Sequence, residues 1–231
     1  MKYITILKRQ AHVWLRAIRD GFSGQKFCRQ RTAGQMLFHI EVEQPFTASA
    51  TLEQKKQNLR LAAERIRRFV VMPGEVFSFW RTVGNPNTRQ FAASRGIRGG
   101  VLQLERGGGL CQASGIIHHL SLKAGFEIVE RYNHSVDLYT EETRFCPLGS
   151  DATVAYGYRD LRVRNTSNSP VRFDLIVHDD HFTGCLCSES QIPEHDIHFE
   201  CTELEDGSLT AKTFDRTTGQ QLFESHYLKQ Q

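Results

Sequence analysis

The sequence predicts an α+β fold in which a central helix bearing Cys111 packs on an antiparallel sheet. Two patterns indicate this class. Apolar residues recur at helical spacing directly after the glycine run 107–109 and stop before Gly125, a typical residue for the end of a helix. After residue 151, short alternating segments are separated by turn sequences, as in a β-meander followed by hairpins. We expect further helices in the N-terminal part of the chain.

The composition is that of an ordinary globular protein. Of the 231 residues, 39% are hydrophobic and 24% are charged, and no apolar run is long enough to span a membrane. The N-terminal residues lack the apolar length and the cleavage site of a secretory signal, so we expect a cytoplasmic protein. The cysteines are scattered along the chain, which favours reduced thiols over a disulfide framework.

The chain is expected to divide into a basic N-terminal segment, 1–50, and an α+β domain, 51–231. The segment should hold a short amphipathic helix that ends near Asp20 and a lead-in strand at 36–40. Residues 1–35 carry eight lysines and arginines against Asp20 alone. This charge suits either a solvated helix face or an arm on an anionic surface. We expect no nucleic acid partner, and at most weak peripheral contact with a membrane.

Three local patterns follow in the domain. Thr51 and Gln54 match a capping box at the start of an amphipathic helix that runs to about Phe69. The segment 76–80 has the apolar alternation of a buried strand. The segment 89–100 is rich in turn residues and is expected to be a loop or a set of short elements, either as one wall of a cleft beside the glycine run or as a surface excursion.

Cys111 is the candidate nucleophile. It lies at the start of the predicted central helix, where unpaired backbone amides and the helix dipole favour a thiolate. His134, on the strand expected after this helix, is the candidate base, and Asp151 is the candidate group that orients its imidazole. Each also has an ordinary structural interpretation: a buried thiol, a hydrogen-bonded histidine and a turn-capping aspartate.

The candidate substrate-binding residues lie near these three. Gln112, or the backbone amide of Cys111, is placed to stabilise an oxyanion, and Ser114 either contacts substrate or bonds along the helix. Glu130 shares a face with His134 on the predicted strand. The predicted substrate-binding set is Gly108, Gly109, Gln112, Ser114 and Glu130.

No cofactor and no metal are predicted. The glycine run lacks the lysine and hydroxyl order of a P-loop and the spacing of a dinucleotide-binding loop. Histidines and cysteines between residues 178 and 201 offer enough ligands for zinc, but their spacing is not that of a zinc ribbon or finger. The pair Cys185 and Cys187 equally suits a sheet core.

The segment from Pro73 to about Thr183 resembles the VanW family, which is named for an accessory protein of B-type vancomycin resistance clusters. The resemblance rests on several motifs that occur in one order. They are 73–79 (PGEVFSF), 107–114 (GGGLCQAS), 125–131, 134–135, 151–154, 160–161 and Asn165. The resemblance implies a family-like core at about 73–183, followed by C-terminal β-hairpins over 184–231, and an association with glycopeptide resistance. It assigns no reaction.

The order of Cys111, His134 and Asp151 is similar to that of transglutaminase-like members of the papain-like thiol class. This likeness of arrangement implies a transglutaminase-like fold and a cysteine-dependent acyl transfer or hydrolysis on an amide or peptide-like, cell-wall-related substrate. The alternative is a non-catalytic accessory protein that binds a peptide or glycan. The sequence leaves this choice, and the oligomeric state, open.

Overall fold

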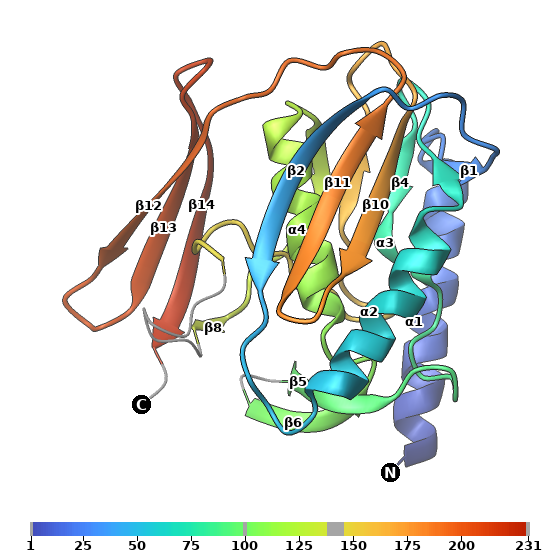
Figure 1. Cartoon of the computed structure of the whole chain (residues 1–231). Helices are drawn as coiled ribbons and strands as arrows, with labels where there is room; N and C mark the ends of the chain where they lie inside the picture. The colour runs from blue at the N-terminus through green and yellow to red at the C-terminus, as the bar shows by residue number, and fades with distance from the viewer. Residues whose placement is uncertain (1, 99–100, 138–145, 230–231) are drawn as a thin grey trace.

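The computed structural model describes residues 2–98, 101–137 and 146–229, and its mixture of helices and sheets confirms the predicted α+β class (Figure 1). Four helices are present in these ranges. They are α1 (Lys2–Phe22), α2 (Leu52–Ile66), α3 (Phe79–Val83) and α4 (Leu110–Lys123). None of them is long and apolar enough to cross a membrane.

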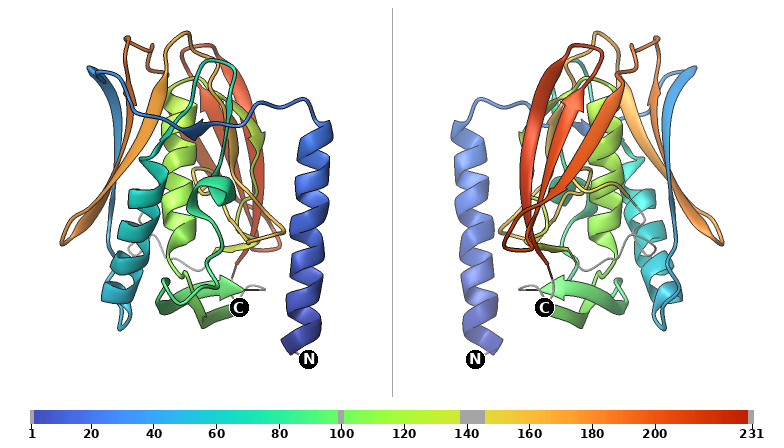
Figure 2. Two further views of the ribbon diagram at one scale, coloured as in Figure 1. Left: turned by 90° about the vertical axis from the view of Figure 1, so that its right-hand side faces the viewer. Right: turned by 90° about the vertical axis from the view of Figure 1, so that its left-hand side faces the viewer.

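Helix α4 lies at the centre of the molecule, with sheets on two sides (Figure 2). Most of its residues are buried, as expected for a helix that is apolar around much of its circumference. Gly109 precedes the helix with a φ of +94°, and Gly125 follows it with a φ of +66°. Both angles suit glycine, so the predicted start and end of this helix are confirmed.

One side of α4 is covered by a three-stranded antiparallel sheet of order β10-β11-β2. β10 (Val171–Val177) and β11 (His181–Ser188) form a hairpin, and β2 (Phe38–Pro45) joins it from the N-terminal part of the chain. Gly184 of β11 allows the sheet to approach α4 closely, because a Cβ at this position would lie 3.0 Å from side-chain atoms of α4.

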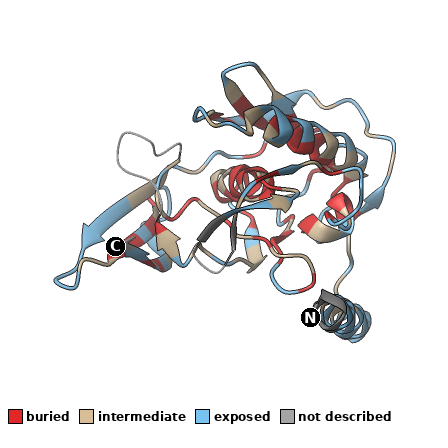
Figure 3. Ribbon diagram, turned by 90° about the horizontal axis from the view of Figure 1, so that it is seen from below, coloured by how far each residue is buried: buried red, intermediate tan, exposed pale blue. Residues whose placement is uncertain are grey.

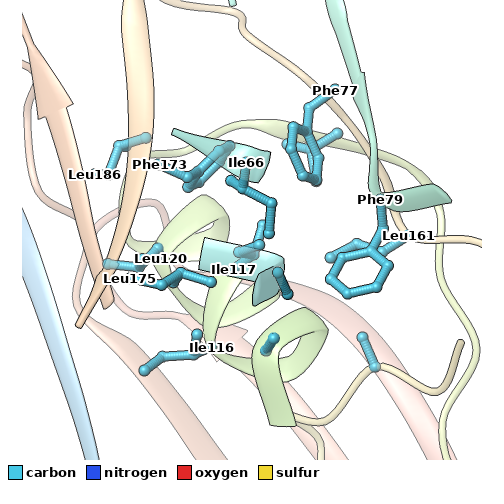
Figure 4. Close-up of a cluster of buried hydrophobic side chains, with 14 of the residues drawn as sticks. Ile66, Phe77, Phe79, Ile116, Ile117, Leu120, Leu161, Phe173, Leu175 and Leu186 are labelled. Atoms are coloured by element: carbon cyan, nitrogen blue, oxygen red, sulfur yellow. The ribbon is translucent and has the colours of Figure 1, made fainter. Parts of the chain in front are cut away.

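The principal hydrophobic core lies between this sheet, α2, α4 and the segments that carry β4 (Val76–Ser78), α3 and β9 (Arg162–Arg164) (Figure 4). Burial of each large apolar side chain contributes about 1.5–3 kcal/mol. The fully or almost fully buried members include Leu59, Ile66, Phe77, Phe79, Ile116, Ile117, Leu120, Leu161, Phe173 and Leu186. Buried residues therefore concentrate on α4 and on one face of α2, whereas α1 is largely exposed (Figure 3).

The C-terminal strands form a second sheet on the other side of α4 (Figure 2). β12 (Ile197–Glu203), β13 (Leu209–Asp215) and β14 (Gln220–Lys229) are antiparallel, and β14 also pairs in parallel with β8 (Val136–Asp137). Phe199 of this sheet packs edge-on against His119 of α4, with ring centroids 5.3 Å apart. The predicted C-terminal hairpins are thus present, and they cover the helix that carries Cys111.

The remaining strands are short. One sheet has the order β4-β9-β7, β1 pairs with β3, and β5 and β6 form a hairpin. Their bounds are β1 (Arg29–Gln30), β3 (Phe69–Val70), β4 (Val76–Ser78), β5 (Ala93–Arg98), β6 (Val101–Arg106), β7 (Glu127–Glu130) and β9 (Arg162–Arg164).

Three predictions for residues 1–69 differ from the structure. Helix α1 continues to Phe22 and is not short, and the lead-in strand begins at Phe38 and extends to Pro45. The capping box is not formed, because the Thr51 hydroxyl accepts a hydrogen bond from the Arg95 backbone amide at 3.1 Å and makes no cap with α2. A tertiary contact thus replaces the predicted local one.

One further prediction near the site differs from the structure. The strand predicted over 76–80 ends at Ser78, whose hydroxyl accepts from the Arg81 amide and donates to Asp160, so the chain turns into α3. Half of the segment 89–100 is strand β5, which pairs with β6, so this segment holds a short element and is not a continuous loop; residues 99–100 lie outside the described ranges. Isolated turn residues in this segment did not prevent strand pairing.

Candidate active site

The glycine turn 107–109 leads into α4 and fixes its N-terminus. Gly107 and Gly109 have φ angles of +75° and +94°, which side chains other than glycine rarely adopt. Gly108 lies against the β5–β6 hairpin, where a Cβ would be 2.4 Å from the hydroxyl and 2.7 Å from the carbonyl oxygen of Ser94. The turn therefore requires glycine for two reasons, backbone conformation and close approach.

Cys111 is the second residue of α4 and is half-buried. Its Sγ donates to the carbonyl oxygen of Val154 at 3.8 Å, and the thiol lies close enough to the His134 ring to raise the pKa of that ring. The predicted position of the thiol at a helix N-terminus is confirmed. The structure also brings the predicted thiol and imidazole together, although the two residues are separated by a helix and a strand.

His134 lies between β7 (Glu127–Glu130) and β8 (Val136–Asp137). The prediction that it lies within one continuous strand is therefore wrong. The strand stops at Glu130 because the following backbone turns toward Asp151. The His134 backbone amide donates to Asp151 Oδ2 at 2.8 Å, and His134 Nδ1 lies 2.7 Å from the same oxygen. With Nδ1 engaged in this way, Nε2 is the ring nitrogen that remains for the thiol of Cys111.

Asp151 is held by two further donors. The Tyr227 hydroxyl donates to Asp151 Oδ1 at 2.6 Å, and Arg131 Nη2 lies 3.1 Å from that oxygen. Arg131 also donates from Nε to the Asp151 carbonyl oxygen at 2.9 Å. Burial favours the neutral acid, but the hydrogen bond to His134 and the charges of His134 and Arg131 outweigh it and hold the pKa of Asp151 well below its usual range.

These contacts also set the charge of His134. Burial lowers the pKa of an imidazole, but hydrogen bonds to Asp151 and Cys111 and the negative charge of Asp151 raise the pKa of His134 to about 10. The ring therefore carries a proton at neutral pH. A protonated ring beside a thiol and an oriented carboxylate is the arrangement used for proton transfer in nucleophilic catalysis.

Cys111, His134 and Asp151, together called the triad below, border a pocket of about 610 Å³. The glycine turn forms one side, and Arg95 and Gly96 of β5 form part of another, so the predicted cleft wall at 89–100 is present as a hairpin strand. Lys55 of α2 also borders the pocket, and burial together with the charge of Arg95 lowers its pKa to about 8. The volume is that of a small-molecule or short-peptide site.

Two glutamine side chains border the pocket with unsatisfied polar groups. Gln112 is 4% exposed and Gln44 is 2% exposed, and among the described residues neither amide has a hydrogen-bond partner at its nitrogen or its oxygen. A buried amide without partners costs free energy, so both groups are available to a bound ligand. Gln112 was predicted from its place beside Cys111. Gln44 was not, because only the pairing of β2 with β11 brings it to the site.

Two other predicted substrate-binding residues lie away from the pocket. The Ser114 hydroxyl is fully buried and donates to the Ala152 carbonyl oxygen at 2.6 Å. Glu130 ends β7, where its carboxylate accepts from Arg16 at 2.6 Å and from the Asp160 backbone amide at 3.0 Å. Because Glu130 and His134 do not share a strand, their predicted common face is absent. Gly108 and Gly109 do border the pocket.

None of the six cysteines, all of which lie in the described ranges, forms a disulfide. Among the described residues, no group of three or more histidine, cysteine or acidic side chains is placed to hold a metal ion. In the region between 178 and 201, His195 instead pairs with Asp215 at 2.7 Å, and Cys185 lies 3.5 Å from Glu41.

The sequence region around this site matches a known family. The family model described as VanW like protein matches residues 54–187, which is more than half of the chain. The chain belongs to the VanW family. Cys111, His134 and Asp151 all lie inside the residues 54–187 that match the VanW family model, whereas Gln44 and Tyr227 lie outside this range.

Two relatives show how far the VanW likeness extends. The chain is 31% identical over 140 residues to the vancomycin B-type resistance protein VanW of Enterococcus faecalis, and this match covers 60% of the chain and 51% of the relative. It is 32% identical over 142 residues to the uncharacterized protein YoaR of Bacillus subtilis, covering 59% of the chain and 45% of the relative. The chain thus matches about half the length of each relative.

No solved structure matches this VanW-family chain. The predicted likeness to transglutaminase-like thiol enzymes finds no support among the proteins that match.

Proposed function

We propose that this VanW-family protein is a cysteine-dependent enzyme that transfers or hydrolyses an acyl group of an amide or peptide-like substrate. One observation carries the proposal: the Cys111 thiol contacts an imidazole whose Nδ1 lies 2.7 Å from Asp151, at the wall of an open pocket. The helix N-terminus adds backbone amides on the side of the thiol.

The reaction proceeds through a thioester. In the resting pair His134 already holds the proton of the thiol, and Cys111 Sγ attacks the carbonyl carbon of the amide as a thiolate. The C–N bond breaks, and His134 gives the proton to the leaving nitrogen. Water or an acceptor amine then attacks the thioester, its proton passes to His134, and the C–S bond breaks, which restores the thiolate and the protonated ring. Asp151 holds the ring in one orientation throughout.

The pocket supports a peptide-like substrate. The amides of Gln44 and Gln112 offer both donors and acceptors, which suits a ligand with its own amide groups. Lys55 and Arg95 place positive charge at the pocket, which suits a ligand that also has a carboxylate. The relative from Enterococcus faecalis is named for vancomycin resistance, so we propose a substrate related to the cell wall.

Selective alkylation tests the catalytic part of this proposal. We expect iodoacetamide at pH 7.5 to modify Cys111 at least about tenfold faster than the exposed Cys201, measured by peptide mass mapping over time. Burial raises the pKa of Cys28 to about 12, and burial with Glu41 raises that of Cys185 to about 12, so these thiols should react slowly.

The controls are Cys111→Ser and His134→Gln. In the first, the fast phase should disappear while labelling of Cys201 is unchanged. In the second, Cys111 should react more slowly because the ring that exchanges its proton is gone. The proposal is wrong if Cys111 reacts no faster than Cys201 in the wild type, or if His134→Gln leaves its rate unchanged.

A second function, non-catalytic binding of a peptide or glycan as an accessory of glycopeptide resistance, is favoured by the amides of Gln44 and Gln112. Within the described part of the chain these amides have no partners, so a ligand would satisfy them whether or not chemistry follows. N-acetylated peptide amides and chitooligosaccharides are suitable probes in calorimetry. Binding that persists in Cys111→Ala, together with no covalent adduct in the wild type, would select this function over the enzymatic one.

A further inference from the structure

Helix α1 is attached to the molecule by its polar side. The residues that face the body recur at helical spacing and are half-buried: Arg9, Val13, Arg16 and Asp20. Asp20 receives two hydrogen bonds from Arg162, at 2.7 Å and 2.9 Å, and Arg16 pairs with Glu130 at 2.6 Å. The docking of α1 thus depends on ion pairs, with Val13 as an apolar residue on the same side.

The opposite side of α1 carries an apolar stripe, which comprises Leu7, Ala11, Trp14, Leu15, Ile18 and Phe22. Each large member is between 54% and 89% exposed. In the views of Figure 2, α1 stands at one edge of the molecule. Single exposed apolar side chains are common, but a stripe along several helical turns marks an interaction surface.

The charge around the stripe points to the kind of partner. Lys8 and Arg19 are exposed beside it, and Asp20, the sole acid in residues 1–35, is engaged by Arg162 and Arg81 on the body side. The outer side of α1 therefore presents apolar residues flanked by cations. A second copy of the chain would meet its own cations there, whereas an anionic lipid surface is complementary in both charge and polarity.

We propose that α1 binds anionic lipid headgroups as an interfacial helix, lying parallel to the bilayer with the apolar stripe at the boundary between headgroups and acyl chains. Trp14 lies midway along the stripe and provides the amphipathic ring that is enriched at this depth. Arg9 of the same helix borders the pocket, so the bound helix holds the pocket near the membrane surface. This inference is independent of the chemistry at Cys111.

Vesicle binding by the full chain tests the proposal. The probes are vesicles of phosphatidylcholine alone and vesicles with about one third phosphatidylglycerol. We expect sedimentation with the anionic vesicles, weakened by added salt, and little with the neutral ones. Ile18→Glu should weaken binding at least about tenfold, because it places a charge in the apolar stripe.

Ile176→Glu is the matched control. Ile176 is 47% exposed on β10, far from α1, and its replacement makes the same change in charge. This variant should bind vesicles like the wild type. Trp14→Ser provides a second variant in the stripe that changes no charge, and it should also weaken binding.

Three results would overturn the proposal. The first is no association of the wild-type chain with anionic vesicles, and the second is an equal loss of binding in Ile18→Glu and Ile176→Glu. The third is a lipid-free dimer in sedimentation equilibrium that Ile18→Glu alone converts to a monomer, since that result would assign the stripe to a second copy.

Discussion

Desolvation and hydrogen bonding oppose each other at the ring of His134. Burial by itself would make the imidazole neutral, as it does for His118 in the same helix–sheet interface, whose pKa is lowered to about 3. At His134 the hydrogen bond to Asp151 reverses the direction, and the pKa rises to about 10. The buried His118, which contacts Ser150, and the half-buried His134, which pairs with Asp151, therefore have opposite charge states at neutral pH.

This difference predicts how the His134–Asp151 pair stabilises the fold as pH changes. The pKa of His134 rises from 6.5 to about 10 on folding, so its contribution is complete below pH 6.5 and is lost as pH rises toward 10. The pKa of Asp151 falls from 3.8, so its contribution is complete above pH 3.8 and is lost in stronger acid. The pair should stabilise most between about pH 4 and pH 6.5.

Urea unfolding of the wild type and His134→Gln measures this effect. We expect the difference in free energy of unfolding to be about 2–4 kcal/mol near pH 6 and to shrink by pH 10. A difference that stays constant from pH 6 to pH 10 would show that the ring does not gain a proton on folding.

At the scale of the element, the turn before α4 depends on the absence of a side chain at Gly108. We predict that Gly108→Ala lowers the free energy of unfolding by about 1–3 kcal/mol, because its Cβ would meet the backbone of Ser94 and Arg95. The same variant should slow alkylation of Cys111, since the turn sets the position of the thiol. Thermal unfolding and the iodoacetamide assay are the measurements.

Gly21→Ala is the matched control for this prediction. Gly21 lies in α1, and a Cβ there meets no atom within 4 Å. This replacement should leave the alkylation rate unchanged and stabilise the helix slightly, since alanine favours a helix by up to about 1 kcal/mol over glycine. Equal effects of the two replacements would contradict the steric argument.

At the scale of the whole molecule, the C-terminal sheet supports the triad from outside the family-matched region. Tyr227 of β14 is 1% exposed, and its hydroxyl donates to Asp151 at 2.6 Å and accepts from the Gly149 amide at 3.0 Å. Arg131 adds a second link, because its Nη1 donates to the Ser225 hydroxyl at 2.6 Å. Tyr227 thus holds Asp151, and Ser225 holds Arg131, which also contacts Asp151.

We predict that Tyr227→Phe lowers the free energy of unfolding by about 1–3 kcal/mol, because it leaves the Gly149 amide without its acceptor and removes one donor from Asp151. Hydrogen exchange should increase at Gly149 and along β14 together. Tyr132→Phe, at a tyrosine that is 40% exposed, is the control and should change stability by less than about 0.5 kcal/mol. Equal losses would show that the hydroxyl of Tyr227 contributes nothing specific.

The N-terminal helix shows the limit of a hydrophobic pattern. Its periodicity correctly indicated an amphipathic helix, but such a pattern does not say which side faces the protein. The ion pairs of Asp20 and Arg16 with distant residues decide the orientation, and they turn the apolar stripe outward. The capping box predicted at Thr51 is absent for a related reason, because the backbone amide of Arg95 in β5 donates to the Thr51 hydroxyl.

The sequence by itself determined the limits of α4, the glycine turn, the place of Cys111 at the helix N-terminus and the order of the C-terminal hairpins. These depend on glycine conformation, helical spacing and turn residues, which act over a few neighbouring residues. Only the tertiary structure decided that β2 joins β11, that His134 leaves its strand to meet Asp151, and that Gln44 and Tyr227 reach the site. Such contacts join residues far apart in the chain, so their geometry is fixed by packing and not by local pattern.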